Sequence, residues 1–392
     1  MASIPGGQFT FFAGNQPVNA VLASGGPLPP PIPGAFNLEV VTSPPGTSST
    51  LPPGYQGVAL LSDNGHDVDL VTGNYGVFVT GMGPDTIQAG SGNDTIIGGW
   101  GSDSILGGSG HDLIYGGFGS DTITAGSGPT TIQGGFGNDL ITGGSGHDVI
   151  YGGFGSDTIT AGSGPTTIQG GFGNDVINGG SGPDVIYGGA GRDTINGGSG
   201  PETIYGGQGH DLIYGGSGPE VIYGSNHEDT IHGGSGPETV HGGYGNDLIY
   251  GGSGSEVLSG GDGNNTIYGG AGHDTIYGGS GNDVVYGGSG PDTISAGAGH
   301  NTIHAGSGAD LIEDQVGGAH DTVFGFDHGN GDAISFAGED HHTIDQVVAT
   351  AHTEHGNTTL NLPDGSTITL VGEVTRVLVE QTTIIDRERL GR

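Results

Sequence analysis

The chain of 392 residues contains no cysteine, and its five basic residues are all arginine. Without cysteine there is neither a disulfide framework nor a thiol site. Nucleic acids and anionic membranes bind proteins through clustered positive charge, so a chain with 42 acidic residues and a net charge of −37 is expected to bind neither. No run of about 18 apolar residues occurs, so we also expect no membrane insertion.

Apolar residues are scarce as well. Hydrophobic residues make up 31% of the chain and aromatic residues 7%, less than an ordinary globular enzyme of this size needs for a thick core. Glycine is abundant instead, with 92 residues against an average usage of about 7%. Collagen would require glycine at every third position, a period that the chain lacks. The composition therefore leaves a disordered chain or repetitive β structure.

A nine-residue repeat dominates the chain. From Asp85 to Asp310 a polar residue, in most cases aspartate, recurs every nine positions without insertion or deletion, and an aliphatic residue follows two positions later. The unit reads G-G-x-G-x-D-x-(Ile)-x, as in residues 116–124. Its glycines suit a turn that needs positive φ, and its last three residues suit a short strand with the middle side chain inward. Two units therefore close one coil of the chain.

Such a solenoid has a thin core made of two facing rows of aliphatic side chains. Ordering each residue costs on the order of 1–2 kcal/mol, which these rows alone are not expected to offset. Aspartate carboxylates and backbone carbonyls of the turns are oxygen ligands suited to Ca²⁺. No histidine recurs at a fixed register, which argues against zinc. The alternative, a calcium-free solenoid with solvated aspartates, would leave stacked negative charge uncompensated.

The repeat resembles the repeats-in-toxin (RTX) family of hemolysin-type calcium-binding nonapeptides over about residues 60–312. The resemblance implies an all-β fold, a parallel β-roll with two nonapeptides per coil and a C-terminal β cap. It also implies multiple Ca²⁺ ions, each between two turns stacked on the same edge. The ligands expected on the first edge are Asp85, Asp103, Asp121, Asp139, Asp157, Asp175, Asp193, Asp211, Asp229, Asp247 and Asp283. Those expected on the second edge are Asp94, Asp112, Asp148, Asp184, Asp274, Asp292 and Asp310.

The two edges differ in their substitutions. The aspartate is replaced by asparagine on the first edge, at Asn265 and Asn301, and by threonine or glutamate on the second. Glutamate is one methylene longer, and the proline that often precedes it removes an N–H group. We therefore predict a near-continuous calcium ladder on the first edge and weaker or altered binding on the second, between about residues 200 and 256. The glutamates are Glu202, Glu220, Glu238 and Glu256.

Five successive turns of the first edge carry an aromatic residue at their third position. Because exposed apolar stripes often mark contact surfaces, we predict that this aromatic column is an interface. Residues 116–151 and 152–187 are nearly identical, which leaves open that some of these residues are only copies made by duplication. The column consists of Trp100, Phe118, Phe136, Phe154 and Phe172.

The flanks differ from the repeat in composition. Residues 1–57 are rich in proline and glycine and are predicted to form an N-terminal arm, either a disordered tail or a segment that adds a strand to a neighbour. Residues 58–312 are assigned to the β-roll. Residues 313–392 are predicted to be the C-terminal β cap, with a β-hairpin over residues 356–370. The RTX resemblance implies that this last region also carries a signal for type I secretion.

No motif of a catalytic site appears. The chain has neither G-x-S-x-G nor H-E-x-x-H, so we expect that it is not an enzyme. The leading hypothesis is a secreted, extracellular, calcium-dependent structural protein that binds to itself as a filament, surface layer or matrix. The alternative is an extracellular adhesin or carbohydrate-binding module that holds a cell-surface glycan with the aromatic column. An accessory subunit of a separate enzyme also stays open.

Overall fold

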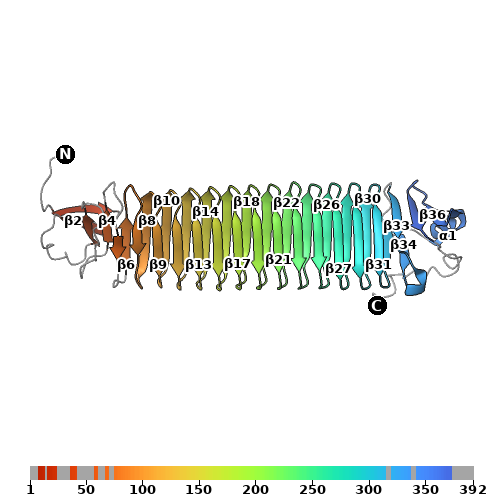
Figure 1. Cartoon of the computed structure of the whole chain (residues 1–392), viewed down its shortest axis with the longest axis horizontal. Helices are drawn as coiled ribbons and strands as arrows, with labels where there is room; N and C mark the ends of the chain where they lie inside the picture. Colours follow the sequence, from red (N-terminus) through yellow and green to blue (C-terminus); the bar gives the residue numbers. More distant parts are fainter. Residues whose placement is uncertain are drawn as a thin grey trace. The chain divides into compact units, whose positions relative to one another are not determined.

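The structure is a computed structural model of the whole chain. It describes residues 8–13, 16–23, 36–41, 57–60, 67–69, 75–314, 319–336 and 341–372. The chain divides into two compact units, Met1–Pro201 and Glu202–Arg392. Each unit is a stack of coils in which the chain alternates between two parallel sheets (Figure 1).

In the first unit, each coil of the repeat contributes one strand to each sheet. One sheet holds β6 (Tyr75–Val79), β8 (Asn93–Trp100), β10 (Asp112–Phe118), β12 (Thr130–Phe136), β14 (Asp148–Phe154), β16 (Thr166–Phe172) and β18 (Val185–Ala190). The other holds β5 (Asp67–Asp69), β7 (Thr86–Gln88), β9 (Ser104–Gly108), β11 (Thr122–Gly126), β13 (Leu140–Gly144), β15 (Thr158–Gly162), β17 (Val176–Gly180) and β19 (Thr194–Gly198). Within the repeat, neighbouring strands pair in parallel and residues two nonapeptides apart lie side by side, as Ile114 does with Ile132.

The second unit continues the same pattern. Its first sheet holds β20 (Thr203–Gln208), β22 (Val221–Asn226), β24 (Thr239–Tyr244), β26 (Val257–Asp262), β28 (Thr275–Ser280), β30 (Thr293–Ala298), β32 (Leu311–Asp314) and β34 (Ala333–Phe336). The opposite sheet holds β21 (Leu212–Gly216), β23 (Thr230–Gly234), β25 (Leu248–Gly252), β27 (Thr266–Ala271), β29 (Val284–Ser289), β31 (Thr302–Ser307) and β33 (His320–Phe324). The prediction of an all-β parallel roll with two nonapeptides per coil is confirmed.

The core consists of the aliphatic rows that the repeat predicts. Ile123 and Ile132, from opposite sheets of the first unit, are fully buried, as are Ile249 and Ile276 in the second. Their strand neighbours on either side point outward, so each short strand buries one large side chain. A core this thin contributes little hydrophobic stabilisation per residue, at about 25 cal/mol per Å² of buried apolar surface.

Glycine sets the shape of the turns. In the turn that begins at Gly116, Gly117 and Gly119 have φ of 118° and 131°, a region that side chains disfavour. One turn departs from this rule, because Ser225 and His227 occupy the equivalent positions with φ of 90° and 77°. Backbone strain of this kind costs on the order of 1–3 kcal/mol per residue.

The parallel ladder begins before the regular repeat. β1 (Gln8–Ala13) and β2 (Gln16–Ala23) form an antiparallel hairpin. β2 pairs in parallel with β3 (Phe36–Val41), β3 with β4 (Gly57–Leu60), and β4 with β6. Three strands thus lie within the predicted N-terminal arm, whereas its proline-rich stretch at 27–33 lies outside the described residues. The division into arm, roll and cap stays a prediction.

The C-terminal end carries extra elements against the opposite sheet of the second unit. After η1 (His328–Asn330) and β34 come α1 (His341–Thr350), β35 (His352–Glu354), β36 (Asn357–Asn361) and β37 (Thr367–Val371). β37 pairs in parallel with β33 and antiparallel with β36, so the predicted hairpin lies against the last strand of that sheet. The repeat pattern did not indicate α1. The tail expected to carry the secretion signal lies, from residue 373 onward, outside the described residues. No described helix is long and apolar enough to cross a membrane.

Candidate metal sites

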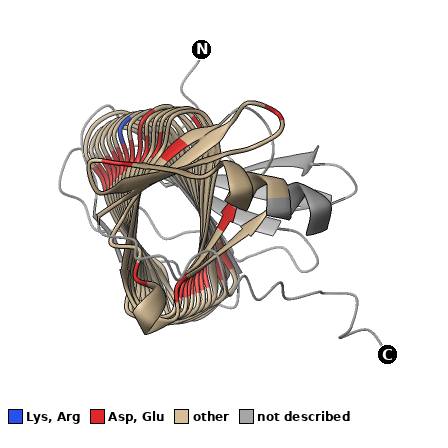
Figure 2. Cartoon of the chain, turned by 90° about the vertical axis from the view of Figure 1, so that its right-hand side faces the viewer, with Lys and Arg blue, Asp and Glu red and all other residues tan. Residues whose placement is uncertain are grey.

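All eighteen aspartates predicted as ligands lie at the turns of the coils, and all are buried. Their exposed fractions range from 1% for Asp121 to 5% for Asp94. Seen along the stack, the acidic residues gather at the two edges where the chain turns from one sheet to the other (Figure 2). Burying so many carboxylates is expensive unless each is hydrogen-bonded or paired with positive charge.

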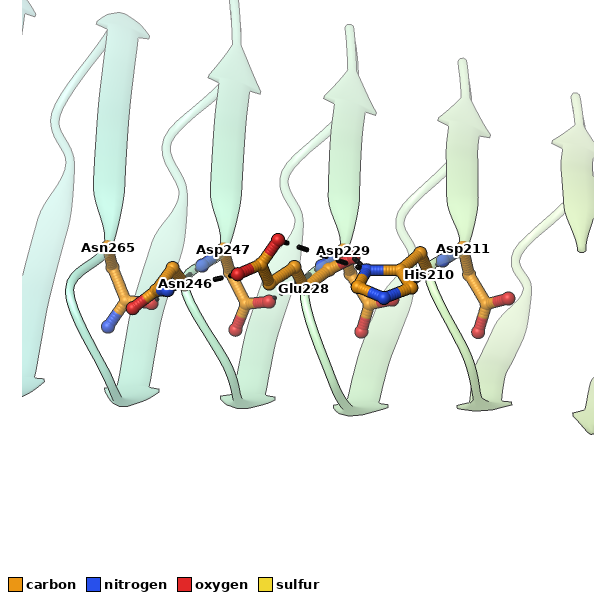
Figure 3. A network of polar contacts seen from close by, with 7 residues as sticks. All are labelled: His210, Asp211, Glu228, Asp229, Asn246, Asp247 and Asn265. Atoms are coloured by element: carbon orange, nitrogen blue, oxygen red, sulfur yellow. Dashed lines mark hydrogen bonds and ion pairs between the residues drawn. The ribbon is translucent and has the colours of Figure 1, made fainter. Parts of the chain in front are cut away.

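In fifteen of these aspartates, one carboxylate oxygen accepts a hydrogen bond from the backbone of the preceding coil. The N–H group of Asp103 donates to Oδ1 of Asp121 over 2.8 Å, and on the second edge the N–H group of Asp94 donates to Oδ1 of Asp112 over 2.9 Å. Asp211, Asp229, Asp247 and Asn265 form one such column in the second unit (Figure 3). This bond fixes the orientation of the side chain and directs its other oxygen into the turn.

The second carboxylate oxygen has no hydrogen-bond partner among the residues that the structure describes. This holds for fourteen of the predicted ligands, and each of these Oδ2 atoms is inaccessible to solvent. An ionised oxygen left in this state is destabilising by several kcal/mol, so these atoms require a cation or a proton. They belong to Asp103, Asp112, Asp121, Asp139, Asp148, Asp157, Asp175, Asp184, Asp229, Asp247, Asp274, Asp283, Asp292 and Asp310.

A backbone carbonyl lies beside the unpartnered oxygen. A Cβ atom added to Gly224 would sit 2.6 Å from Oδ2 of Asp229 and 2.6 Å from the carbonyl oxygen of Gly242 in the next coil. Only glycine keeps that point open, and oxygen ligands surround Ca²⁺ at 2.3–2.6 Å. No three described Asp, Glu or His side chains gather into a metal-binding group. The donors beside this point are a carboxylate oxygen and a backbone carbonyl oxygen, and both are ligands that calcium prefers.

The electrostatics agree with a site that needs a cation. Burial raises the pKa of Asp103 and of Asp139 to about 7, and neighbouring aspartates on the same edge add to the effect. Burial likewise raises the pKa of Asp229 to about 8. In each case the backbone N–H bond acts in the opposite direction but is the smaller effect. Without a cation, Asp229 is therefore mostly protonated at neutral pH, and Asp103 and Asp139 are partly protonated.

The glutamates of the second edge sit differently in their turns. Burial and the carboxyl groups of Glu202 and Glu238 raise the pKa of Glu220 to about 8, and burial and Asp274 raise that of Glu256 to about 9. Oε2 of Glu220 lies 3.2 Å from the Cβ point of Gly215, whereas Oδ2 of Asp274 lies 2.7 Å from that of Gly269. That glutamate turns bind calcium more weakly stays a prediction.

Two aspartates that the repeat analysis missed continue the two edges into the cap. The N–H group of Asn301 donates to Oδ1 of Asp321 over 3.3 Å, and that of Asp310 donates to Oδ1 of Asp332 over 3.0 Å. They follow their partners by 20 and 22 residues, which hid them from a search with a fixed period. The signal that would find them is an aspartate two positions before an aliphatic residue, as at Asp321 and Val323.

The aromatic column is exposed and stacked, as the spacing predicts. Neighbouring ring centroids lie 4.6–4.9 Å apart, with interplanar angles of 4–24°. The exposed fractions range from 44% for Phe118 to 58% for Phe172. The column lies in the first unit at the ends of β8, β10, β12, β14 and β16. That this column is an interface stays a prediction.

A second ladder of rings, on the outer face of the sheet that contains β21 to β33, was missed. Its centroids lie 4.5–5.0 Å apart, and all of its rings belong to the second unit. The sequence signal is an aromatic residue or histidine directly after the buried aliphatic residue in every second nonapeptide, from Tyr214 to His304. The ladder consists of Tyr214, His232, Tyr250, Tyr268, Tyr286, His304 and Phe324.

Comparison with known proteins agrees with the donor set. The family model described as RTX calcium-binding nonapeptide repeat (4 copies) matches overlapping segments that together run from residue 79 to 313. They are 79–114, 99–132, 124–159, 133–168, 169–201, 187–219, 196–231, 223–255, 232–265, 250–285 and 286–313.

Among solved structures, a hyperactive, Ca²⁺-dependent, β-helical antifreeze protein from an Antarctic bacterium is similar at 18% identity and a TM-score of 0.36, over 77% of this chain and 93% of that chain. No curated protein matches. The prediction of multiple calcium ions is confirmed, whereas the assignment of individual ligands stays a prediction.

Proposed function

The chain belongs to the RTX family of calcium-binding nonapeptide-repeat proteins, and on that basis we propose that it is a secreted structural protein. Its β-roll folds with calcium and assembles with other copies outside the cell as a filament, surface layer or matrix. RTX repeat proteins are generally secreted. Extracellular calcium in the millimolar range loads sites with dissociation constants of about 10⁻⁴–10⁻³ M, which cytosolic calcium leaves empty.

The observation that carries the proposal is the exposed aromatic column. Monomeric proteins rarely leave a contiguous apolar stripe in water, yet five rings are stacked at 4.6–4.9 Å on one edge of the first unit. A partner that meets such a column needs the same spacing along its own length. A second copy of the roll has it.

The distribution of charge supports self-association. From β7 to β33, the residues on either side of each buried aliphatic residue are uncharged, with the single exception of Glu313. The charge of the repeat is confined to its turns, where calcium neutralises it. Two copies can therefore bring their sheet faces together without burying like charges, whereas a partner bound through charge would have to bind elsewhere.

The stacking geometry favours assembly over glycan binding. A sugar places its C–H groups over the face of an aromatic ring, where the π-electron density lies. In the column, both faces of Phe118, Phe136 and Phe154 are covered by neighbouring rings, so only ring edges point to solvent. Ring edges suit packing against another apolar surface. The adhesin stays the alternative, and the absence of enzymatic activity stays a prediction.

The proposal is tested with the purified full chain, by electron microscopy and light scattering with chelator and at about 10 mM calcium, which is above the dissociation constants of weak extracellular sites. We expect calcium-dependent polymers whose lateral association weakens when Phe118, Phe136, Phe154 and Phe172 are replaced by serine. Serine at His111 and His147, which are exposed in turns of the second edge and lie outside both the aromatic column and the sheet faces, is the control. A wild-type chain that stays monomeric at high concentration with calcium refutes assembly, and glycan binding by that monomer supports the adhesin.

A further inference from the structure

Two turns of the second edge carry threonine in place of the ligand aspartate, and each threonine satisfies its own turn. Oγ1 of Thr130 donates to the carbonyl oxygen of Gly128 over 3.2 Å, and Oγ1 of Thr166 donates to that of Gly164 over the same distance. Both threonines are buried, with exposed fractions of 2% and 3%. An ionised aspartate has no proton to donate, so at an aspartate turn this carbonyl is left to a cation.

The backbone adapts to the missing carboxylate. In the regular pattern, the N–H group of Asp112 would donate to a carboxylate 18 residues further on, at position 130. It donates instead to the carbonyl oxygen of Pro129 over 3.2 Å, and the N–H group of Asp148 donates to that of Pro165 over the same distance. The coils around both threonines are therefore held by direct hydrogen bonds.

The same two turns also begin with a residue other than glycine. Their first residue is alanine, Ala125 or Ala161, and both are fully buried. One coil earlier, a Cβ atom at Gly107 would sit 2.6 Å from the carbonyl oxygen of Ala125 and 3.0 Å from Oδ2 of Asp112. The methyl groups of Ala125 and Ala161 occupy the equivalent point in their own turns. Buried alanines also begin the turns of Asp94 and Asp310, at Ala89 and Ala305, so the threonine is what distinguishes these two turns from the ligand turns.

Asparagine has a comparable effect on the first edge. Oδ1 of Asn265 accepts the N–H group of Asp247 over 2.9 Å, so the backbone fixes the amide and directs Nδ2 into the turn. There Nδ2 lies 2.6 Å from the Cβ point of Gly260, where neighbouring turns have an unpartnered carboxylate oxygen. It donates to the carbonyl oxygen of Gly263 over 3.4 Å.

Asn301 repeats this arrangement next to the cap. Its Oδ1 accepts the N–H group of Asp283 over 2.9 Å, and its Nδ2 donates to Oδ1 of Asp321 over 2.9 Å. The first residue of its turn is again a buried alanine, Ala296. An amide proton and a calcium ion cannot occupy the same oxygen-lined point, because both carry positive charge to it.

We infer that Thr130, Thr166, Asn265 and Asn301 interrupt the calcium ladders, each placing a hydrogen-bond donor where the other turns bind an ion. On the second edge of the first unit, Asp148 is then isolated between two calcium-free turns. On the first edge of the second unit, the run from Asp211 to Asp247 is separated from Asp283. The ladder predicted as near-continuous is divided into segments joined by coils that need no calcium.

The number of calcium ions bound per full-length chain, measured by equilibrium dialysis and native mass spectrometry, tests this inference. Asn265→Asp restores a carboxylate beside a glycine, and we expect one ion more than in the wild type. Asn264→Asp adds the same charge one residue away, on the exposed side, and is expected to bind the wild-type number. Asp121→Asn is the converse variant and is expected to bind one ion fewer.

A double variant, Ala125→Gly with Thr130→Asp, rebuilds a site in the first unit and keeps the test decisive if Asn265→Asp does not fold. Folding is checked by circular dichroism with calcium. The double variant is expected to gain one ion. Wild-type stoichiometry in the double variant or in a folded Asn265→Asp, or no loss of an ion in Asp121→Asn, overturns the inference.

Discussion

The backbone N–H group of Asp103 donates a 2.8 Å hydrogen bond to Oδ1 of Asp121 in the next coil, while Oδ2 of Asp121 is buried with no hydrogen-bond partner in the described part of the chain. One carboxylate thus performs two tasks. Its Oδ1 atom links successive coils through this hydrogen bond, and its Oδ2 atom is left for a cation. Folding and calcium binding are coupled through the same side chain.

Removing calcium is expected to unfold the roll. The sites do not exist in the unfolded chain, so the free energy of binding becomes free energy of folding. We expect a mostly disordered circular dichroism spectrum with chelator and a β-sheet spectrum that appears cooperatively as calcium is added at pH 7.5. A β-sheet spectrum that persists in excess chelator would contradict this coupling.

Low pH is expected to stabilise the calcium-free roll in part, because protons neutralise the carboxylates that calcium would otherwise bind. Burial raises the pKa of Asp103 to about 7 and that of Asp229 to about 8 in the folded chain, above the ordinary value of 3.8. The folded state without calcium therefore binds more protons than the unfolded state, so its stability is greatest below about pH 4 and is lost as pH rises through 7 to 8.

Chain freed of calcium by dialysis should therefore show more β structure at pH 5 than at pH 8. Calcium affinity should fall over the same interval as the pH is lowered, because protons compete for the same oxygens. Circular dichroism and calcium titrations at both pH values measure this. Greater folding of the calcium-free chain at pH 8 would show that the carboxylates are not protonated in the roll.

Truncating one core residue is expected to lower the free energy of unfolding strongly, although the core is thin. Ile159 is fully buried, and Ile159→Ala should lower the free energy of unfolding by about 2–5 kcal/mol. The neighbouring Thr158 points outward, so Thr158→Ala is the matched control, with an expected change within about 0.5 kcal/mol. Denaturant titrations with saturating calcium give both values. Equal effects would mean that the two faces of the strand are not distinguished.

The strained turn offers a stabilising substitution. Ser225 and His227 hold φ values of 90° and 77° that glycine adopts without strain. Ser225→Gly and His227→Gly should each stabilise the roll by about 1 kcal/mol. Ser253→Gly, at a turn position without positive φ, should not stabilise it. Melting temperatures with calcium report the difference, and a lower melting temperature for both variants would show that contacts of Ser225 and His227 outweigh the strain.

Much of the fold could be predicted from the nine-residue period of the sequence. The nine-residue spacing predicted which side chain of each strand faces the core and which aromatic residues stack, because a coil of two units puts every eighteenth residue in register. A pattern with a fixed period could not find Asp321 and Asp332, since the cap lengthens the coil before each of them. The ring ladder follows the 18-residue register from Tyr214 to His304, and Phe324 falls outside that register because the cap lengthens the coil before it.

The sequence by itself determined the fold and the kind of ion, because glycine, aspartate and isoleucine at fixed intervals admit one coil geometry and supply oxygen ligands to it. Only the tertiary structure decided which oxygen of each carboxylate is committed to the backbone and which is free for calcium. That division depends on the N–H group of the preceding coil, as the pair of Asp247 and Asn265 shows. The donor atom of Asn265 faces the turn because its acceptor is already taken, a consequence of stacking that no single repeat contains.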